Sequence, residues 1–308
     1  MRILVTGVTG AIGSGLAPCL VDAGHEVRAL TRRRDHATLP ALPDAVTLQT
    51  GDAVSGIGLA EALRDVEVAF YLIHSMEPGG AEPFGVRERR SAENFAEAAA
   101  AAGVRRIVYL GGLVPDTAPS AHLASRLQVE RILLETVPDS VALRASIVIG
   151  ARSRSFRFLV HLIERMPILV IPAWGGHRTA PVDARDVLRC LTQAATDPRV
   201  GGRSLDIAGA EIVTYAQLIT RIRDLMLLDR PTVRLPGLTL TPIASRVSAV
   251  IAEEEHALIG PLMAGLESDL LPRPALALEL LGLRPHALDA AIERALRDWE
   301  STEPLRAR

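Results

Sequence analysis

Apolar runs of strand length alternate with helical patterns through the first half of the chain. The runs predict strands at residues 2–7, 26–31, 46–52, 67–73, 105–111 and 141–150. Most of them lack an alternation of polar and apolar residues, which is typical of parallel strands that helices cover on both faces. Segments with helical spacing lie between the runs, at residues 11–23, 56–64, 84–102 and 121–136. This order predicts an α/β fold with a doubly wound parallel sheet.

The pattern of apolar residues becomes less regular after residue 150. Helical spacing recurs at residues 153–165, 184–196, 214–227 and 286–299, with no clear linker before them. We therefore predict a first domain over residues 1–150 and a smaller, mostly helical lobe over residues 151–308 that continues from the sheet. The apolar pattern of residues 243–271 predicts two more helices, with Pro and Gly at both ends of the segment and between the helices. This segment is either a helical lid over a hydrophobic substrate, or part of the core or of a dimer interface.

The composition limits the classes of partner. The chain has 308 residues, a net charge of −2, two cysteines and eight scattered histidines without paired metal-ligand spacing. The small charge favours neither nucleic acid nor an anionic membrane, and the few cysteines indicate a reducing compartment. No apolar run approaches the ~20 residues of a membrane helix, and the chain starts directly in a strand. We expect a soluble, cytoplasmic monomer or homodimer without a metal site.

The segment "TGVTGAIG" follows the first predicted strand and opens the first predicted helix. Gly7 suits the tight turn, Gly10 lets the backbone approach a pyrophosphate, and Gly13 allows the helix to pack closely on the strand. Thr9, Ala11 and Ile12 complete the turn, and the helix N-terminus offers free N–H groups to the phosphates. In this context the glycines predict a Rossmann-type dinucleotide site.

The end of the second predicted strand, "ALTRRR", indicates which dinucleotide binds. Sites that prefer NAD place Asp or Glu here, to accept hydrogen bonds from the ribose hydroxyls. This chain instead has Thr31 followed by Arg32, and a guanidinium favours a 2′-phosphate through charge-assisted bonds. We therefore expect NADPH/NADP+, with Arg32 as the first contact and Arg33 as the second. The alternative is a solvated basic loop.

Two later strand ends add cofactor contacts. "GDA", with Asp52 and Ala53, fits a contact beside the adenine, and "LIHSM", with Leu72 and His74, would line the ribose and nicotinamide. His74 is as compatible with a structural role as with a functional one.

Several segments together resemble a known family. The spacing of the glycines, "GDA" and "YLIHSM" resemble the short-chain dehydrogenase/reductase superfamily. "FGVRERRSAENFAEAAAAAGVRRIVYLGGLVPD", "SAHLASRLQVERIL" and "LRASIVIG" resemble its atypical, NmrA-like branch, over roughly residues 1–230. The resemblance implies a Rossmann fold that binds NAD(P), and it says little about the substrate.

The same resemblance exposes a departure at the catalytic positions. Active members place Ser or Thr after the fifth strand and Tyr-x-x-x-Lys on the next helix. Here Gly111 and Gly112 follow the fifth strand, with Gly111 expected against the cofactor, while His122 and Arg126 occupy the Tyr and Lys positions. Histidine titrates near neutrality and arginine is always cationic, so this pair is our candidate for catalysis. The alternatives are a proton from water or from the substrate itself, or a site without catalysis.

The resemblance also assigns substrate binding to the second half of the chain. Ser146, Ile147 and Val148 are then expected to lie closest to the nicotinamide carboxamide. Phe156, Phe158, Met166 and Trp174 are candidates for an apolar pocket, although their helical spacing favours a core.

These observations favour an enzyme that reduces a ketone with NADPH, without the usual Tyr proton donor. We expect a bulky, largely apolar small molecule as substrate, such as an aromatic polyketide of the angucyclinone type, because two glycines widen the space beside the nicotinamide. A lysine-free, arginine-rich composition is typical of high-GC bacteria, where such antibiotic pathways are common. The alternative is an NADP(H)-binding redox sensor without turnover, as in some NmrA-like proteins. A cofactor-assisted isomerase or cyclase is a weaker third option.

Overall fold

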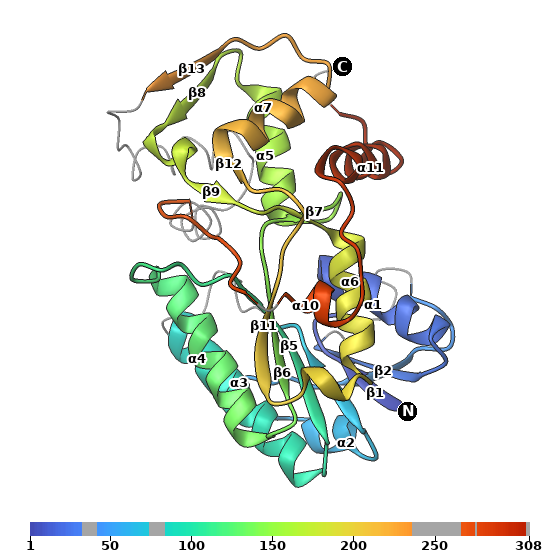
Figure 1. Ribbon diagram of the computed structural model, residues 1–308. Helices are drawn as coiled ribbons and strands as arrows, with labels where there is room; N and C mark the ends of the chain where they lie inside the picture. The colour runs from blue at the N-terminus through green and yellow to red at the C-terminus, as the bar shows by residue number, and fades with distance from the viewer. Residues whose placement is uncertain (33–41, 74–83, 236–265, 275, 306–308) are drawn as a thin grey trace.

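The computed structural model describes residues 1–32, 42–73, 84–235, 266–274 and 276–305. A seven-stranded sheet forms its centre, in the order β11-β6-β5-β4-β1-β2-β3 (Figure 1). The strands are β1 (Arg2–Val5), β2 (Glu26–Thr31), β3 (Thr47–Thr50), β4 (Val68–Tyr71), β5 (Arg106–Gly112), β6 (Val141–Ala145) and β11 (Arg203–Ile207). All six pairings between neighbours are parallel. The Rossmann-like α/β fold predicted from the sequence is confirmed.

Helices cover both faces of this sheet, which explains why its central strands β1, β4 and β5 are largely apolar (Figure 1). One face carries α1 (Ala11–Asp22), α6 (Ala184–Ala194) and the short α10 (Ala277–Leu280). The other carries α2 (Leu59–Leu63), α3 (Phe84–Ala101) and α4 (Ala121–Thr136). All four residues of β4 are buried, as are the first six of β5. The strand order reverses at β1 and β4, and the carboxyl ends of strands at such a reversal are where ligands bind in open α/β sheets.

The strand predicted over residues 141–150 is in fact two strands. β6 ends at Ala145, and β7 (Val148–Ile149) pairs separately with β10 (Val182–Asp183). Between them the Ser146 amide donates to the Ile207 carbonyl at 3.0 Å, and the Val182 amide donates to the Ile147 carbonyl at 3.0 Å. The chain thus leaves the sheet here without leaving these backbone groups unpaired.

The second half of the chain contributes both to the α/β layer and to a separate lobe. α6 and β11 pack into the sheet, so residues on both sides of position 150 build the same α/β layer. The rest forms a lobe beyond the carboxyl ends of the strands (Figure 1). Its elements are α5 (Arg154–Arg165), β8 (Leu169–Pro172), η2 (Ala173–Gly176), β9 (Arg178–Thr179), β12 (Val213–Thr214), α7 (Tyr215–Leu225), β13 (Thr232–Leu235) and α11 (Leu288–Glu300). Outside the lobe, the short helix η3 (Pro198–Val200) connects α6 to β11.

The lobe has its own hydrophobic core. Phe156, Phe158 and Trp174 are buried in it, and Met166 packs against it. The core interpretation of these four residues is therefore confirmed. Most of the segment 243–271, interpreted as a lid or an interface, lies outside the described residues. None of the helices in the described ranges is both long and apolar enough to span a membrane.

Candidate functional site

A cavity of about 590 Å³ lies at the carboxyl ends of the central strands, between the sheet and the lobe. Fifteen of the residues that the sequence predicted for the site line this cavity. They are Gly7, Thr9, Gly10, Ala11, Ile12, Gly13, Arg32, Asp52, Ala53, Leu72, Gly111, Arg126, Ser146, Ile147 and Val148. His122 is not among the lining residues, and Arg33 and His74 lie outside the described part of the chain.

The glycine-rich turn is built so that a side chain at its key positions would collide with backbone. Gly7 has a φ of +66°, and a Cβ there would lie 2.5 Å from the carbonyl oxygen of Leu72. A Cβ on Gly13 would run into the Gly7 carbonyl, where α1 packs on the turn. The Gly10 amide closes the turn by donating to the Gly7 carbonyl at 2.9 Å. This close-packed strand–turn–helix fits the pyrophosphate of a dinucleotide at the start of α1.

The adenine side of the cavity is fixed by hydrogen bonds that the sequence alone did not indicate. Asn94 on α3 donates from Nδ2 to the carbonyls of Ala53 and Val54, at 3.0 and 2.9 Å. Asp52 accepts from the Val54 amide at 3.1 Å. The bonds from Asn94 hold the loop after β3 against α3. Asn94 was missed because nothing in its helical surroundings indicates that it reaches a loop some forty residues earlier.

The opposite end of the cavity is formed where β5, β6 and β7 end. Ser146 is buried, and its hydroxyl lies 3.0 Å from that of Thr179, which is also buried. Gly112 pairs with Ala145 across the sheet, and Gly111 lines the cavity. The fold therefore brings the two glycines close to the segment Ser146–Val148, as the prediction for the nicotinamide end requires.

His122 sits on the first turn of α4, where Ser120 caps the helix by accepting from the Leu123 amide at 3.4 Å. Its ring lies 5.6 Å from that of Phe84, and its Nδ1 is buried with no hydrogen-bond partner in the described residues. Burial, and then the charge of Arg126, lower the pKa of His122 to about 4. His122 is therefore neutral at physiological pH.

Arg126 lies one turn further along α4 and does line the cavity. Its Nη1 is 3.7 Å from the place that a Cβ on Gly112 would occupy, which puts the guanidinium at the carboxyl end of β5. Its Nε is buried, and no residue of the described ranges accepts a hydrogen bond from it. The Tyr109 hydroxyl donates to the Arg126 backbone carbonyl at 3.4 Å, which anchors this turn of α4 to β5.

Three further arginines line the cavity and were not predicted. Arg87 comes from α3, Arg152 from the turn before α5, and Arg154 is the first residue of α5. Nη1 of Arg152 donates to the Ser14 hydroxyl at 2.7 Å, in the first turns of α1. This contact joins positions 138 residues apart, so no local pattern could reveal it. In the part of the chain that the structure describes, no group of three His, Cys, Asp or Glu residues could hold a metal ion.

Comparisons with known proteins agree with this architecture. Residues 1–150 match the model of the NmrA-like family. The chain is 31% identical over 218 residues to the (4-alkanoyl-5-oxo-2,5-dihydrofuran-3-yl)methyl phosphate reductase of Streptomyces griseus, covering 69% of each chain. It is 24% identical over 235 residues to the ceramide reductase of Caulobacter vibrioides, covering 76% of this chain and 73% of that one.

One similar solved structure matches nearly the whole chain. This structure is of a short-chain dehydrogenase/reductase superfamily protein from Agrobacterium tumefaciens with bound NAD, and it matches at a TM-score of 0.69 and 18% identity. The match covers 99% of this chain and 100% of that one, so the two share their fold.

Proposed function

We propose that this chain, which belongs to the NmrA-like family of the short-chain dehydrogenase/reductase superfamily, is an NADPH-dependent ketoreductase. At the coarser level it is an NAD(P)-dependent oxidoreductase of the NmrA type. The observation that carries the proposal is one cavity that joins the glycine-rich turn, Arg32 and the ends of β5 and β6. Two relatives named as reductases support the direction of the reaction.

The geometry also supports a bulky substrate. Gly111 and Gly112 place no side chain beside the segment Ser146–Val148, where other members of the superfamily carry a hydroxyl residue. A polycyclic or long-chain ketone, such as an aromatic polyketide, is the class of substrate we propose.

The proton for the reduced oxygen comes, in this proposal, from water or from a hydroxyl of the substrate. When bound, NADPH supplies a hydride to the carbonyl carbon, and negative charge develops on the oxygen. Arg126 provides a permanent cation on the cavity wall. His122 is neutral at physiological pH and is not among the lining residues, which favours a structural role on α4 over the catalytic one we predicted.

Arg32→Ala tests the preference for NADPH. Arg32 follows β2, where the ribose of the adenosine half is expected, and charge-assisted bonds to a phosphate are worth roughly 1.5–3 kcal/mol. We expect NADPH affinity to fall about 10- to 100-fold, because about 1.4 kcal/mol corresponds to a tenfold change. NADH affinity should stay within about twofold, and cofactor fluorescence titration measures both. Equal losses for the two cofactors would contradict the assignment of Arg32 to the 2′-phosphate.

NADPH consumption in the presence of polycyclic aromatic ketones and long-chain ketones tests the reduction itself. The expected result is turnover of at least one bulky ketone, with Ser120→Ala as a control that weakens only the cap of α4. Tight NADPH binding without turnover across the panel would favour the second candidate, a redox sensor. The observation behind that candidate is that Gly111, Gly112, His122 and Arg126 stand where active relatives carry Ser, Tyr and Lys.

A further inference from the structure

The wall of the cavity carries far more positive than negative charge. Five arginines line it: Arg32, Arg87, Arg126, Arg152 and Arg154. Asp52 is the one carboxylate among the described lining residues. The whole chain has a net charge of only −2, so this concentration of guanidinium groups is local. A cavity wall of one sign raises the local concentration of ligands of the opposite sign.

The dinucleotide accounts for two of these arginines. Arg32 follows β2 and is assigned to the 2′-phosphate. Arg152 reaches Ser14 in α1, next to the glycine-rich turn, and is therefore positioned to contact the pyrophosphate. Both lie on the side of the cavity where the cofactor's phosphates are expected.

Arg126 and Arg154 lie where the substrate is expected. Arg126 projects beside Gly112 at the nicotinamide end, and Arg154 is the first residue of α5 in the lobe. Neither side chain forms an ion pair with any residue of the described ranges, in contrast to Arg144, whose Nη2 lies 2.6 Å from Glu130. Arg126 is partly buried, and a partly buried cation that is not paired is costly unless a ligand compensates it; Arg154 is exposed.

We propose that the substrate carries a phosphate monoester, which Arg126 binds from the sheet side of the cavity and Arg154 from the lobe side. The proposal rests on the proposed function, because it concerns the substrate of that reduction. Two guanidinium groups match the double charge of a phosphate monoester at neutral pH, whereas a carboxylate carries one charge. The phosphate thereby bridges the two layers that enclose the cavity and holds the carbonyl near the nicotinamide end.

Matched ketones test this proposal directly. The probes are 4-acetylphenyl phosphate, the neutral 4-hydroxyacetophenone and the carboxylate 4-acetylbenzoate, each reduced with saturating NADPH. We expect kcat/KM for the phosphate ester to exceed that for the neutral ketone by at least about tenfold, since a charge-assisted contact contributes roughly 1.5–3 kcal/mol. Arg126→Met and Arg154→Met should each reduce that ratio by at least about fivefold. Arg131→Met is the matched control, because Arg131 is exposed on α4 and does not line the cavity.

A binding measurement separates this proposal from the proposed function. With NADP+ bound, phenyl phosphate should raise the Tm of the wild-type protein, phenol should not, and Arg154→Met should abolish the shift. Equal reduction of the neutral and the phosphorylated ketone, with no Tm shift, would overturn the phosphate site and leave the reductase intact. Preference for the carboxylate would also overturn it. If no ketone is reduced but phenyl phosphate still binds through Arg154, the reductase fails and the anion site stands.

Discussion

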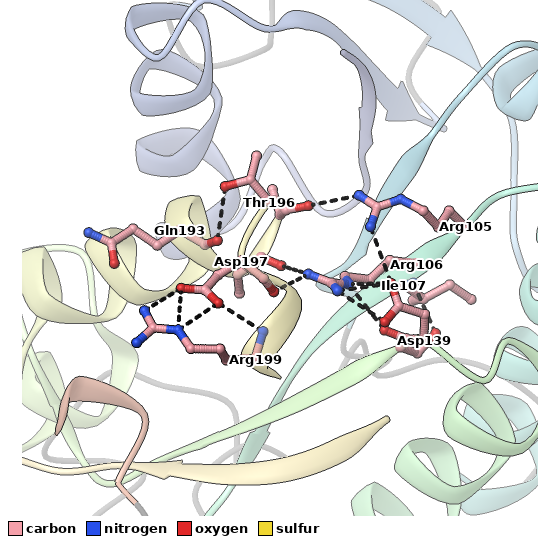
Figure 2. Close-up of polar contacts among 11 residues, drawn as sticks. Arg105, Arg106, Ile107, Asp139, Gln193, Thr196, Asp197 and Arg199 are labelled. Carbon is pink, nitrogen blue, oxygen red and sulfur yellow. Dashed lines mark hydrogen bonds and ion pairs between the residues drawn. The ribbon is translucent and has the colours of Figure 1, made fainter. Parts of the chain in front are cut away.

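An arginine with a buried guanidinium nitrogen lies at each end of β5, Arg106 on the strand itself and Arg126 on α4, and the two differ in their hydrogen bonds. Arg106 begins the strand, and its side chain is fully buried. All its guanidinium nitrogens are paired: Nε and Nη2 donate to the Asp139 carboxylate at 3.0 Å, and Nη1 donates to the carbonyls of Ala194 and Asp197 at 2.8 Å (Figure 2). At the far end, Arg126 lies beside Gly112 with a buried Nε that has no partner in the described residues.

The difference separates a structural arginine from a functional one. Arg106 fastens β5 to the loop before β6 and to the end of α6, so the fold uses every one of its donors. Arg126 lines a cavity, and its Nε has no acceptor in the described residues. Buried polar groups are normally hydrogen-bonded, and an exception at the ligand-binding edge of an α/β sheet indicates a site.

Arg106→Met is expected to have the largest effect on stability. It removes the Arg106 donors from three carbonyls, those of Asp139, Ala194 and Asp197, and the buried partner from one carboxylate. The free energy of unfolding should therefore fall by about 3 kcal/mol or more. Urea denaturation followed by circular dichroism measures this loss. Arg105→Met is the matched control, because Arg105 is half-exposed and pairs with the same Asp139 at 3.3 Å. The free energy of unfolding of the control should fall by no more than about 1 kcal/mol. Similar losses for the two variants would contradict the structural role assigned to the buried Arg106.

The same substitution at the other end of the strand should hardly change stability. Arg126→Met removes a cation without a described ion-pair partner and keeps most of the side-chain volume. We expect the free energy of unfolding to stay within about 1 kcal/mol of wild type, or to rise. The pKa of His122 should rise as well, because Arg126 is one of the two causes that lower it. NMR titration of the histidine detects that shift, and a large loss of stability would mean that Arg126 is structural like Arg106.

His122 makes a smaller, pH-dependent contribution. Its pKa of about 4 in the folded protein lies below the ordinary value of 6.5, so the unfolded chain takes up the extra proton between these values. The contribution of His122 is fully present above pH 6.5 and is lost as the pH falls toward 4. His122→Phe should therefore narrow the difference in urea midpoint between pH 7 and pH 4.5. An unchanged difference would show that His122 is not buried in its neutral form.

The dinucleotide turn could be predicted from the sequence because its signals are local. Gly7, Gly10 and Gly13 stand directly after an apolar strand, and the steric need for each follows from that strand–turn–helix context. The ends of the other parallel strands could be placed for the same reason, since parallel strands must end at one edge of the sheet. Arg32 lines the cavity because β2 ends there.

The contacts between the two halves of the chain could not be predicted. Arg152 meets Ser14, and β11 completes the sheet beside β6, only because the chain returns from the lobe. The break after Ala145 has a similar origin, since Ile147 pairs with Val182, which comes later in the chain. His122 was assigned because it occupies the Tyr position of the family pattern, but a position in that pattern does not show which of two residues on a helix reaches the cavity.

The most direct test of the central claim is a fluorescence titration of the wild-type protein with NADPH and with NADH. The structure assigns the glycine-rich turn and Arg32 to one cavity, so NADPH should bind with enhanced emission and at least about tenfold more tightly than NADH. A protein that bound neither cofactor would contradict the assignment of the turn between β1 and α1, and with it the reductase.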